Sequence, residues 1–155
     1  MKTFVIGDIH GAYKGLLQCL ERSGFDREAD RLIALGDVCD GWPQVKECVD
    51  ELLKIKNLVY IFGNHDQWTL NWAKTGEIPD VWFAQGGSNT VLSYNNGPMP
   101  AGHVRFFENA SRYFLEGERL FVHAGFDPVK PMAEQDPELL IWDRKLIVSA
   151  FQKHN

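Results

Sequence analysis

Apolar residues gather in four short, unbroken runs along the chain. The runs cover residues 4–6, 32–35, 58–62 and 120–122. Because these residues do not alternate with polar ones, the runs predict strands that are covered on both faces. Strands of this kind belong to layered α/β proteins.

The segments between the first three runs have the spacing of helices. The apolar positions are Tyr13, Leu16, Leu17 and Leu20 in the first segment and Val45, Cys48, Val49 and Leu52 in the second. The i, i+3, i+4, i+7 spacing predicts helices that lie on a sheet. The chain therefore begins βαβαβ, and right-handed crossovers make neighbouring strands parallel, with their carboxyl ends along one edge.

The second half of the sequence is less regular. Residues 65–75 form a Trp-rich helical stretch, and Gly86-Gly87 and residues 95–98 are turn signals. Residues 112–115 and 120–122, on either side of a glycine turn, predict a hairpin and with it a second sheet. A final helical stripe covers residues 139–150.

Composition indicates a globular protein without a nucleic-acid or membrane partner. The 155 residues are 45% hydrophobic and 24% charged, close to the averages for soluble domains. The net charge is −5 and no run of Lys or Arg is present, so no basic field is available for nucleic acid. The first apolar run is too short for a signal peptide or a membrane span, and a cytoplasmic location without a membrane partner is expected.

The three cysteines, Cys19, Cys39 and Cys48, are odd in number and lack C-x-x-C spacing. This pattern argues against a disulfide framework and a zinc knuckle. Cys19 and Cys48 are expected to be buried in helices, and Cys39 to pack beneath the site described next.

Each of the apolar runs is followed by polar residues that can bind metal. The candidates are Asp8, His10, Asp37, Asn64 and His123. Ligands of open α/β sheets bind at the carboxyl ends of the strands, so these separate segments should meet. Asp8 and His10 alternate with Ile9, and in extended backbone their side chains point the same way.

The candidate ligands offer carboxylate oxygen, amide oxygen and imidazole nitrogen, a set that suits Mn²⁺, iron or Zn²⁺. One carboxylate can bridge two metals about 3.5–4 Å apart, the usual spacing in two-metal phosphatases. Asp37, which is central in the set, is the bridging candidate.

Three motifs in this order resemble the calcineurin-like metallophosphoesterase signature: Gly-Asp-x-His-Gly at residues 7–11, Gly-Asp-x-x-Asp at 36–40 and Gly-Asn-His-Asp at 63–66. The chain is most similar to small bacterial and phage serine/threonine protein phosphatases, from residue 2 to about residue 144. The resemblance implies that Asp8, His10 and Asp37 hold one metal and that Asp37, Asn64 and His123 hold a second.

The resemblance also implies roles beyond metal binding. His65 becomes the catalytic acid with Asp40 hydrogen-bonded behind it, and Asn64 also contacts substrate. Asp66 is expected to be a helix-start acid rather than a ligand. A metal-bound hydroxide would attack phosphoserine or phosphothreonine proteins, or small phosphomonoesters. The alternatives are a dinucleoside polyphosphate hydrolase and a non-catalytic metal-binding regulatory module.

Two departures from the family pattern qualify this expectation. Relatives have a phosphate-binding Arg directly after the second aspartate of Gly-Asp-x-x-Asp, but this chain has Gly41 and then Trp42. Arg144, within a Trp-Asp-Arg segment, is the replacement candidate because a guanidinium can fork onto phosphate. Trp42 is a candidate apolar wall that would favour a flat leaving group.

The second departure concerns the last metal ligand. Relatives supply it from a Gly-His pair downstream of the Trp-Asp-Arg segment, and this chain has none there. His103 follows a glycine but precedes His123, and His154 has no preceding glycine, so neither is expected to be a ligand. Residues 1–155 are therefore interpreted as one metallophosphoesterase domain that lacks its C-terminal segment.

Overall fold

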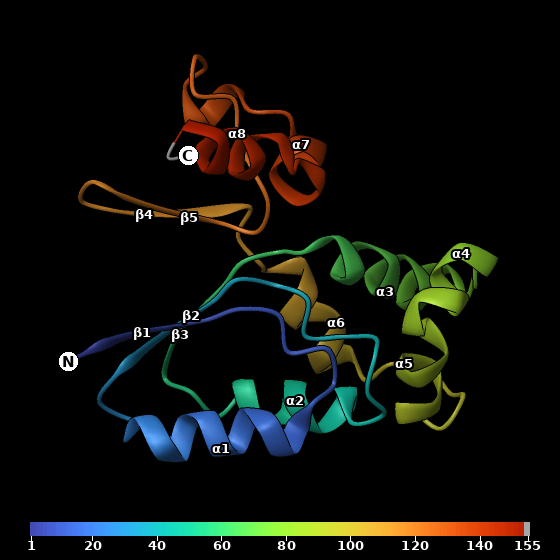
Figure 1. The fold of residues 1–155 in the computed structure, drawn as a ribbon. Helices are drawn as coiled ribbons and strands as arrows, with labels where there is room; N and C mark the ends of the chain where they lie inside the picture. The colour runs from blue at the N-terminus through green and yellow to red at the C-terminus, as the bar shows by residue number, and fades with distance from the viewer. Residues whose placement is uncertain (154–155) are drawn as a thin grey trace.

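The N-terminal half of the computed structural model, which describes residues 1–153, has the predicted βαβαβ order (Figure 1). The elements are β1 (Thr3–Ile6), α1 (Tyr13–Ser23), β2 (Arg31–Ala34), α2 (Val45–Leu52) and β3 (Asn57–Tyr60). The strands are parallel in the order β1-β2-β3, with Phe4 opposite Leu32 and Leu32 opposite Leu58. The predicted α/β class is confirmed.

Helices α1 and α2 lie together on one side of this sheet (Figure 1). They bury the predicted stripes, including Leu16, Leu20, Val49 and Leu52, within the main core. Full burial of a Leu or Val contributes about 1.5–3 kcal/mol, so these faces hold the helices to the sheet.

The prediction that the strands are covered on both faces is correct for β2 and wrong for β1. Residues Leu32, Ile33 and Ala34 of β2 are buried, but Val5 of β1 is 51% exposed. The reason is position, because β1 is an edge strand in the described residues and β2 is central. Cys19 is also exposed, contrary to expectation, whereas Cys39 and Cys48 are buried.

The middle of the chain is helical. The predicted Trp-rich helix is α3 (Asn64–Thr75), and it is followed by α4 (Asp80–Trp82), a π-helical turn η1 (Phe83–Gly87), α5 (Ser88–Ser93) and α6 (Ala101–Glu108). The turn signal at Gly86-Gly87 is a kink within consecutive helical turns, where Gly86 has a φ of 101°. Sequence patterns did not predict α4, α5 or α6.

The predicted hairpin is confirmed as β4 (Tyr113–Glu116) and β5 (Arg119–Val122), an antiparallel pair. It begins beside the parallel sheet, because the Ser111 N–H donates to the Tyr60 carbonyl (2.9 Å) and the Phe62 N–H donates to the Ser111 carbonyl (2.9 Å). These bonds bring the end of β5, and thus His123, to the carboxyl edge of the parallel strands.

The final helical stripe is interrupted. A 3₁₀ turn (Met132–Glu134) precedes α7 (Pro137–Trp142) and α8 (Lys145–Lys153). Asp143 has extended backbone and accepts hydrogen bonds from the N–H groups of Lys145 (3.2 Å) and Leu146 (3.3 Å), which caps α8. The single predicted helix is thus two helices. Every helix in residues 1–153 is too short or too polar to cross a bilayer.

Glu51 of α2 is a buried acid that fastens the helix to the loop before β2. Its carboxylate, only 4% exposed, forms ion pairs with Arg27 and Lys54. Burial opposes the charge, but the bonds from Lys54 and Arg27 outweigh it, and the pKa of Glu51 is lowered below its ordinary value.

We predict that Glu51→Gln lowers the free energy of unfolding at pH 7 by about 1 kcal/mol, because the charged hydrogen bonds are lost. A lowered pKa stabilises the fold above the unfolded value of 4.5, and this contribution disappears as pH falls through the folded value. Denaturant unfolding at pH 7 and pH 3 measures both effects. Glu47→Gln, on an exposed position of the same helix, is the matched control; equal destabilisation by both variants would contradict the prediction.

Candidate active site

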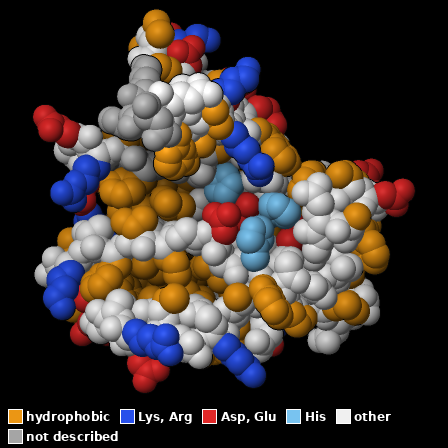
Figure 2. All heavy atoms as spheres, in the orientation of Figure 1, with side chains coloured by type: hydrophobic (Ala, Val, Ile, Leu, Met, Phe, Trp, Pro, Cys, Tyr) orange, Lys and Arg blue, Asp and Glu red, His pale blue; other side chains and the backbone are white. Residues whose placement is uncertain are grey.

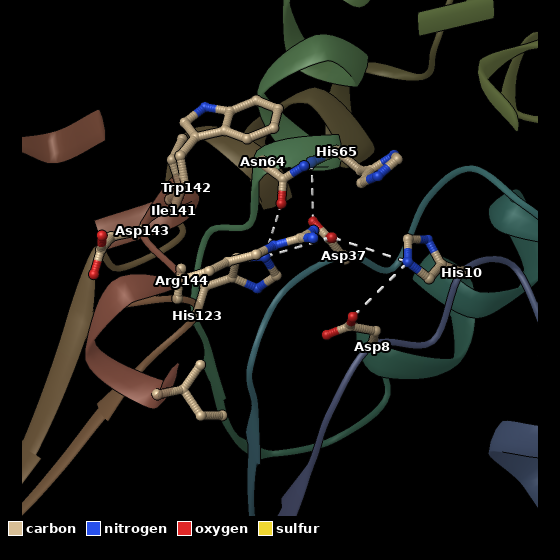
Figure 3. Close-up of a pocket in the computed structure, with 12 residues that line it drawn as sticks. Asp8, His10, Asp37, Asn64, His65, His123, Ile141, Trp142, Asp143 and Arg144 are labelled. Atoms are coloured by element: carbon tan, nitrogen blue, oxygen red, sulfur yellow. Dashed lines mark hydrogen bonds and ion pairs between the residues drawn. The ribbon is translucent and has the colours of Figure 1, made fainter. Parts of the chain in front are cut away.

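Histidine and acidic side chains gather in one hollow of the face seen in Figure 2. The hollow contains a cavity of about 330 Å³ at the carboxyl ends of the strands. Its lining includes all five predicted metal ligands, His65 and Arg144, with Ala124, Ile141, Trp142, Asp143 and Ile147. Figure 3 shows that Asp8, His10, Asp37, Asn64 and His123 turn toward one another from separate segments.

Two histidines present a nitrogen lone pair to this cavity. The Nδ1 of His10 lies 2.8 Å from the Cys39 carbonyl, and the Nδ1 of His123 lies 2.7 Å from the Leu35 carbonyl. A carbonyl only accepts hydrogen bonds, so each Nδ1 carries the proton. In the neutral ring the Nε2 atom is then unprotonated, which is the tautomer that binds metal.

Both Nε2 atoms face acceptor oxygens. The Nε2 of His10 lies 3.9 Å from Asp8 Oδ2 and 4.0 Å from Asp37 Oδ2. The Nε2 of His123 lies 3.5 Å from Asp37 Oδ2 and 3.0 Å from Asn64 Oδ1. Lone pairs that converge without protons between them repel, and a cation between them converts that repulsion into attraction. The donor set therefore fits divalent metal.

The two carboxylate oxygens of Asp37 have different partners, one in the backbone and one in the site. Its Oδ1 accepts from the backbone N–H of His65 (3.0 Å), at the N-terminus of α3. This leaves Oδ2 between His10 and His123. Asp37 consequently belongs to two clusters whose nitrogen and oxygen atoms lie within 4.8 Å of one another: one with Asp8 and His123, the other with His10 and His65. Burial and the charge of Asp66 raise the pKa of Asp37 to about 6, against the opposing effects of His123 and His65.

His65 and Asp40 form a hydrogen-bonded pair, with 2.6 Å between His65 Nδ1 and Asp40 Oδ2. Asp40 is fully buried and accepts further hydrogen bonds from Trp82 Nε1 (2.8 Å) and Thr90 Oγ1 (2.6 Å). With Nδ1 bonded to Asp40, the remaining His65 nitrogen, Nε2, is the one available for proton transfer. Burial lowers the pKa of His65, but the Asp40 hydrogen bond and the charges of Asp37, Asp40 and Asp66 outweigh it, and the net pKa is raised.

The backbone around the site is held in an uncommon conformation. His10, Asp37 and Asp40 have φ values of 47°, 52° and 67°, in the left-handed region that few non-glycine residues adopt. Strained positions of this kind cluster at functional sites. Gly63 makes the close approach possible, because a Cβ there would lie 2.0 Å from Asp37 Oδ1.

Asp66 connects the two loops that carry the ligands. It does lie in the first turn of α3, as predicted, and its Oδ2 accepts from the Gly63 N–H (2.9 Å). The same oxygen also accepts from the Asp37 N–H (3.1 Å) and the Tyr60 hydroxyl (2.8 Å), while Oδ1 accepts from Cys39 Sγ (3.2 Å). Asp66 thus fixes the Asp37 loop against the start of α3, a function that its sequence position did not indicate.

Of the other candidate residues, Arg144 reaches the cavity and His103 does not. The Arg144 side chain extends into the cavity toward Asp37 (Figure 3). His103, by contrast, is buried outside the cavity, with Nδ1 2.9 Å from the Tyr94 hydroxyl and Nε2 3.0 Å from Asp50 Oδ1. His154 lies outside the described residues.

Sequence reasoning missed Trp82 and Thr90, which hold Asp40. Neither residue carried a signal for this contact, because Trp82 and Thr90 lie 42 and 50 residues from Asp40 in the chain. Only the packing of α4 and α5 against the Asp40 loop brings these donors to it.

A parallel sheet with carboxylate, imidazole and amide ligands at its carboxyl edge defines an α/β protein with a candidate metal centre. The chain belongs to the calcineurin-like phosphoesterase family, whose family model matches residues 1–155.

Individual relatives divide between two activities. The chain is 33% identical over 132 residues to the symmetrical bis(5'-nucleosyl)-tetraphosphatase of Dechloromonas aromatica, covering 83% of this chain and 45% of the relative. It is 33% identical over 85 residues to serine/threonine-protein phosphatase 1 of Salmonella typhimurium, covering 55% and 38%. The chain thus spans less than half the length of these two relatives.

A solved structure supports the same fold. The crystal structure of a provisionally assigned diadenosine tetraphosphatase has a TM-score of 0.72 and 23% identity, and the match covers 89% of this chain and 56% of that one.

We predict that Asp66→Asn weakens Mn²⁺ binding by roughly 10- to 100-fold, the usual effect of losing a residue that orients metal ligands. An amide cannot accept from all four donors, so the Asp37 and Gly63 loops lose their common anchor. Titration calorimetry with Mn²⁺ measures the affinity. Asp136→Asn, which removes the charge from the residue capping α7, is the control, and unchanged affinity in Asp66→Asn would refute the assignment.

Proposed function

We propose that this protein hydrolyses phosphoester bonds with the help of two divalent cations, with Mn²⁺ as the first candidate. The observation that carries the proposal is the arrangement around Asp37 Oδ2, which faces the Nε2 atoms of His10 (4.0 Å) and His123 (3.5 Å). His65, paired with the fully buried Asp40, lies beside it. A metal site next to a positioned proton donor is the combination that phosphoester hydrolysis requires.

Asp8, His10 and Asp37 would hold one cation, and Asp37, Asn64 and His123 the second, with Asp37 shared. Such cations lower the pKa of water and withdraw negative charge from phosphate oxygens.

His65 would act on the leaving group. When the bond between phosphorus and the leaving oxygen breaks, that oxygen needs a proton, which the Nε2 of protonated His65 donates. Asp40 holds the ring in place and stabilises its charged form through the 2.6 Å hydrogen bond. Because Asp40 is itself held by Trp82 and Thr90, the imidazole has little freedom to turn away.

Arg144 would bind the phosphate in place of the arginine that position 41 lacks. Its side chain reaches into the cavity from the segment between α7 and α8. A planar guanidinium donates two parallel hydrogen bonds to phosphate, which a point charge cannot do.

The substrates we propose first are phosphomonoesters, including phosphoserine and phosphothreonine in proteins. Dinucleoside polyphosphates are the second candidate. The relatives support both, since one is named a bis(5'-nucleosyl)-tetraphosphatase and another a serine/threonine-protein phosphatase. The exposed indole of Trp42 beside the site, 65% exposed, adds weight to the second.

We predict that His65→Asn and Asp40→Asn each lower the Mn²⁺-stimulated kcat for p-nitrophenyl phosphate, with His65→Asn losing about 10²- to 10⁴-fold, the usual contribution of a general acid. Metal content, measured by mass spectrometry of the purified chain, should stay unchanged in His65→Asn, because the proposed ligand sets do not include His65.

Asp37→Asn is the informative comparison, because a protein without the shared ligand should lose both its metal and its activity. An unchanged kcat in His65→Asn would remove it as the acid. A wild-type chain that binds Mn²⁺ but hydrolyses nothing would favour the non-catalytic regulatory module instead.

We further predict that Arg144→Lys raises the inhibition constant of inorganic phosphate by about tenfold, because the bidentate pair becomes a single contact. Lys145→Arg on the adjacent exposed position is the control. Equal inhibition of Arg144→Lys and wild type would show that Arg144 does not contact phosphate.

A further inference from the structure

A second cavity, of about 450 Å³, borders the metal-site cavity. Its lining consists of His10, Gly41, Trp42, His65 and Gln85. His10 and His65 line both cavities, so the two histidines, whose ring centroids lie 4.9 Å apart, are where the cavities adjoin. Apolar side chains border the histidines on the face seen in Figure 2.

The backbone beneath Trp42 is fixed although its side chain is exposed. The Trp42 N–H donates to the His10 carbonyl (2.8 Å), and the preceding Asp40 is held by the hydrogen bonds to its carboxylate. The side-chain amide of Asn89 donates to the Gly41 carbonyl. The indole therefore projects from an anchored loop, and the bonds that position Asp40 also hold the backbone next to Trp42.

Gln85 reaches this cavity because the backbone at Gly86 touches the backbone at Gly41. Gly86, with a φ of 101°, lies against Gly41, and a Cβ at Gly86 would be 2.3 Å from the Gly41 nitrogen. This contact brings the kink of η1 beside the loop that carries Trp42. The lining therefore includes an aromatic residue and a residue whose side-chain amide can both donate and accept hydrogen bonds.

The location of this cavity relates it to the leaving group. The oxygen that receives a proton from His65 must lie against the imidazole, and whatever is attached to that oxygen extends away from the phosphate. In the proposed reaction the phosphate would occupy the metal-site cavity, and the cavity with Trp42 is another one that His65 lines.

We propose that Trp42 and Gln85 form a subsite for the base of a leaving nucleotide, with the base stacked on the indole and its edge bonded to the Gln85 amide. The inference rests on the proposed hydrolytic function and specifies its substrate as a nucleoside polyphosphate. A serine or threonine side chain offers no planar face to Trp42, whereas every base does, and stacking on an aromatic side chain is sequence-tolerant and substantial.

The test compares substrates that share the phosphoanhydride but differ in the base. With Mn²⁺, Trp42→Ala should lower kcat/KM for diadenosine tetraphosphate by about tenfold or more, the effect of losing one stacking contact, and change kcat/KM for inorganic tripolyphosphate by less than about twofold. Trp42→Phe should retain most of the activity. Phe83→Ala removes another exposed aromatic side chain, outside both cavity linings, and should affect neither substrate.

A binding measurement separates this inference from the proposed hydrolysis. Calorimetric titration with ADP and with pyrophosphate, in EDTA, reports base recognition without turnover, and Trp42→Ala should weaken ADP binding alone. If the wild-type chain hydrolyses neither substrate but loses ADP affinity on Trp42→Ala, the subsite is supported and the hydrolysis is not. Equal losses for both substrates in Trp42→Ala, or wild-type binding of ADP no tighter than pyrophosphate, overturn the subsite.

Discussion

The position of one carboxylate, that of Asp37, is the constraint on which the site depends. One oxygen is bonded to the first turn of α3, and the other is left among the nitrogen lone pairs of His10 and His123. Without a cation this grouping is unfavourable, and burial adds to it by raising the pKa of Asp37 to about 6. The fold must therefore supply enough rigidity to hold mutually repelling acceptors in place.

That rigidity comes from polar groups buried under the site rather than from the apolar core alone. Asp66 accepts hydrogen bonds from both loops, and Asp40 is held by Trp82 and Thr90. Such groups are stabilising only when every partner is present, because an unpaired buried polar group is costly. The left-handed backbone at Asp37 and Asp40 is tolerated because these bonds compensate for its strain.

The sequence indicated the parts of the fold whose signals are local. Short stretches of sequence are enough to show the apolar runs of β1 to β3, the helical spacing of α1 and α2, and the hairpin. The family motifs fall at strand ends, where the topology makes them converge. The helices from Asp80 to Glu108 escaped prediction because they are short and interrupted by Gly86, whose kink looks like a turn in the sequence. The break at Asp143 was hidden because apolar spacing continues on both sides of it.

The contacts of Asp66 and Thr90 could not be predicted for a different reason. Hydrogen bonds between residues 29 and 50 positions apart depend on packing that no periodicity encodes. The same dependence explains why Trp42 acquires meaning only in three dimensions. In the sequence, Trp42 is only the residue after Gly41, which stands where relatives have an arginine. In the structure, the contact between Gly86 and Gly41 brings Gln85 to the cavity that Trp42 and His65 line. The loss of a cationic phosphate ligand and the gain of an aromatic face thus occur in one loop. In the proposed function, Arg144 would bind the phosphate on one side of the His65 ring, and the cavity with Trp42 on the other side would distinguish what the phosphate is attached to.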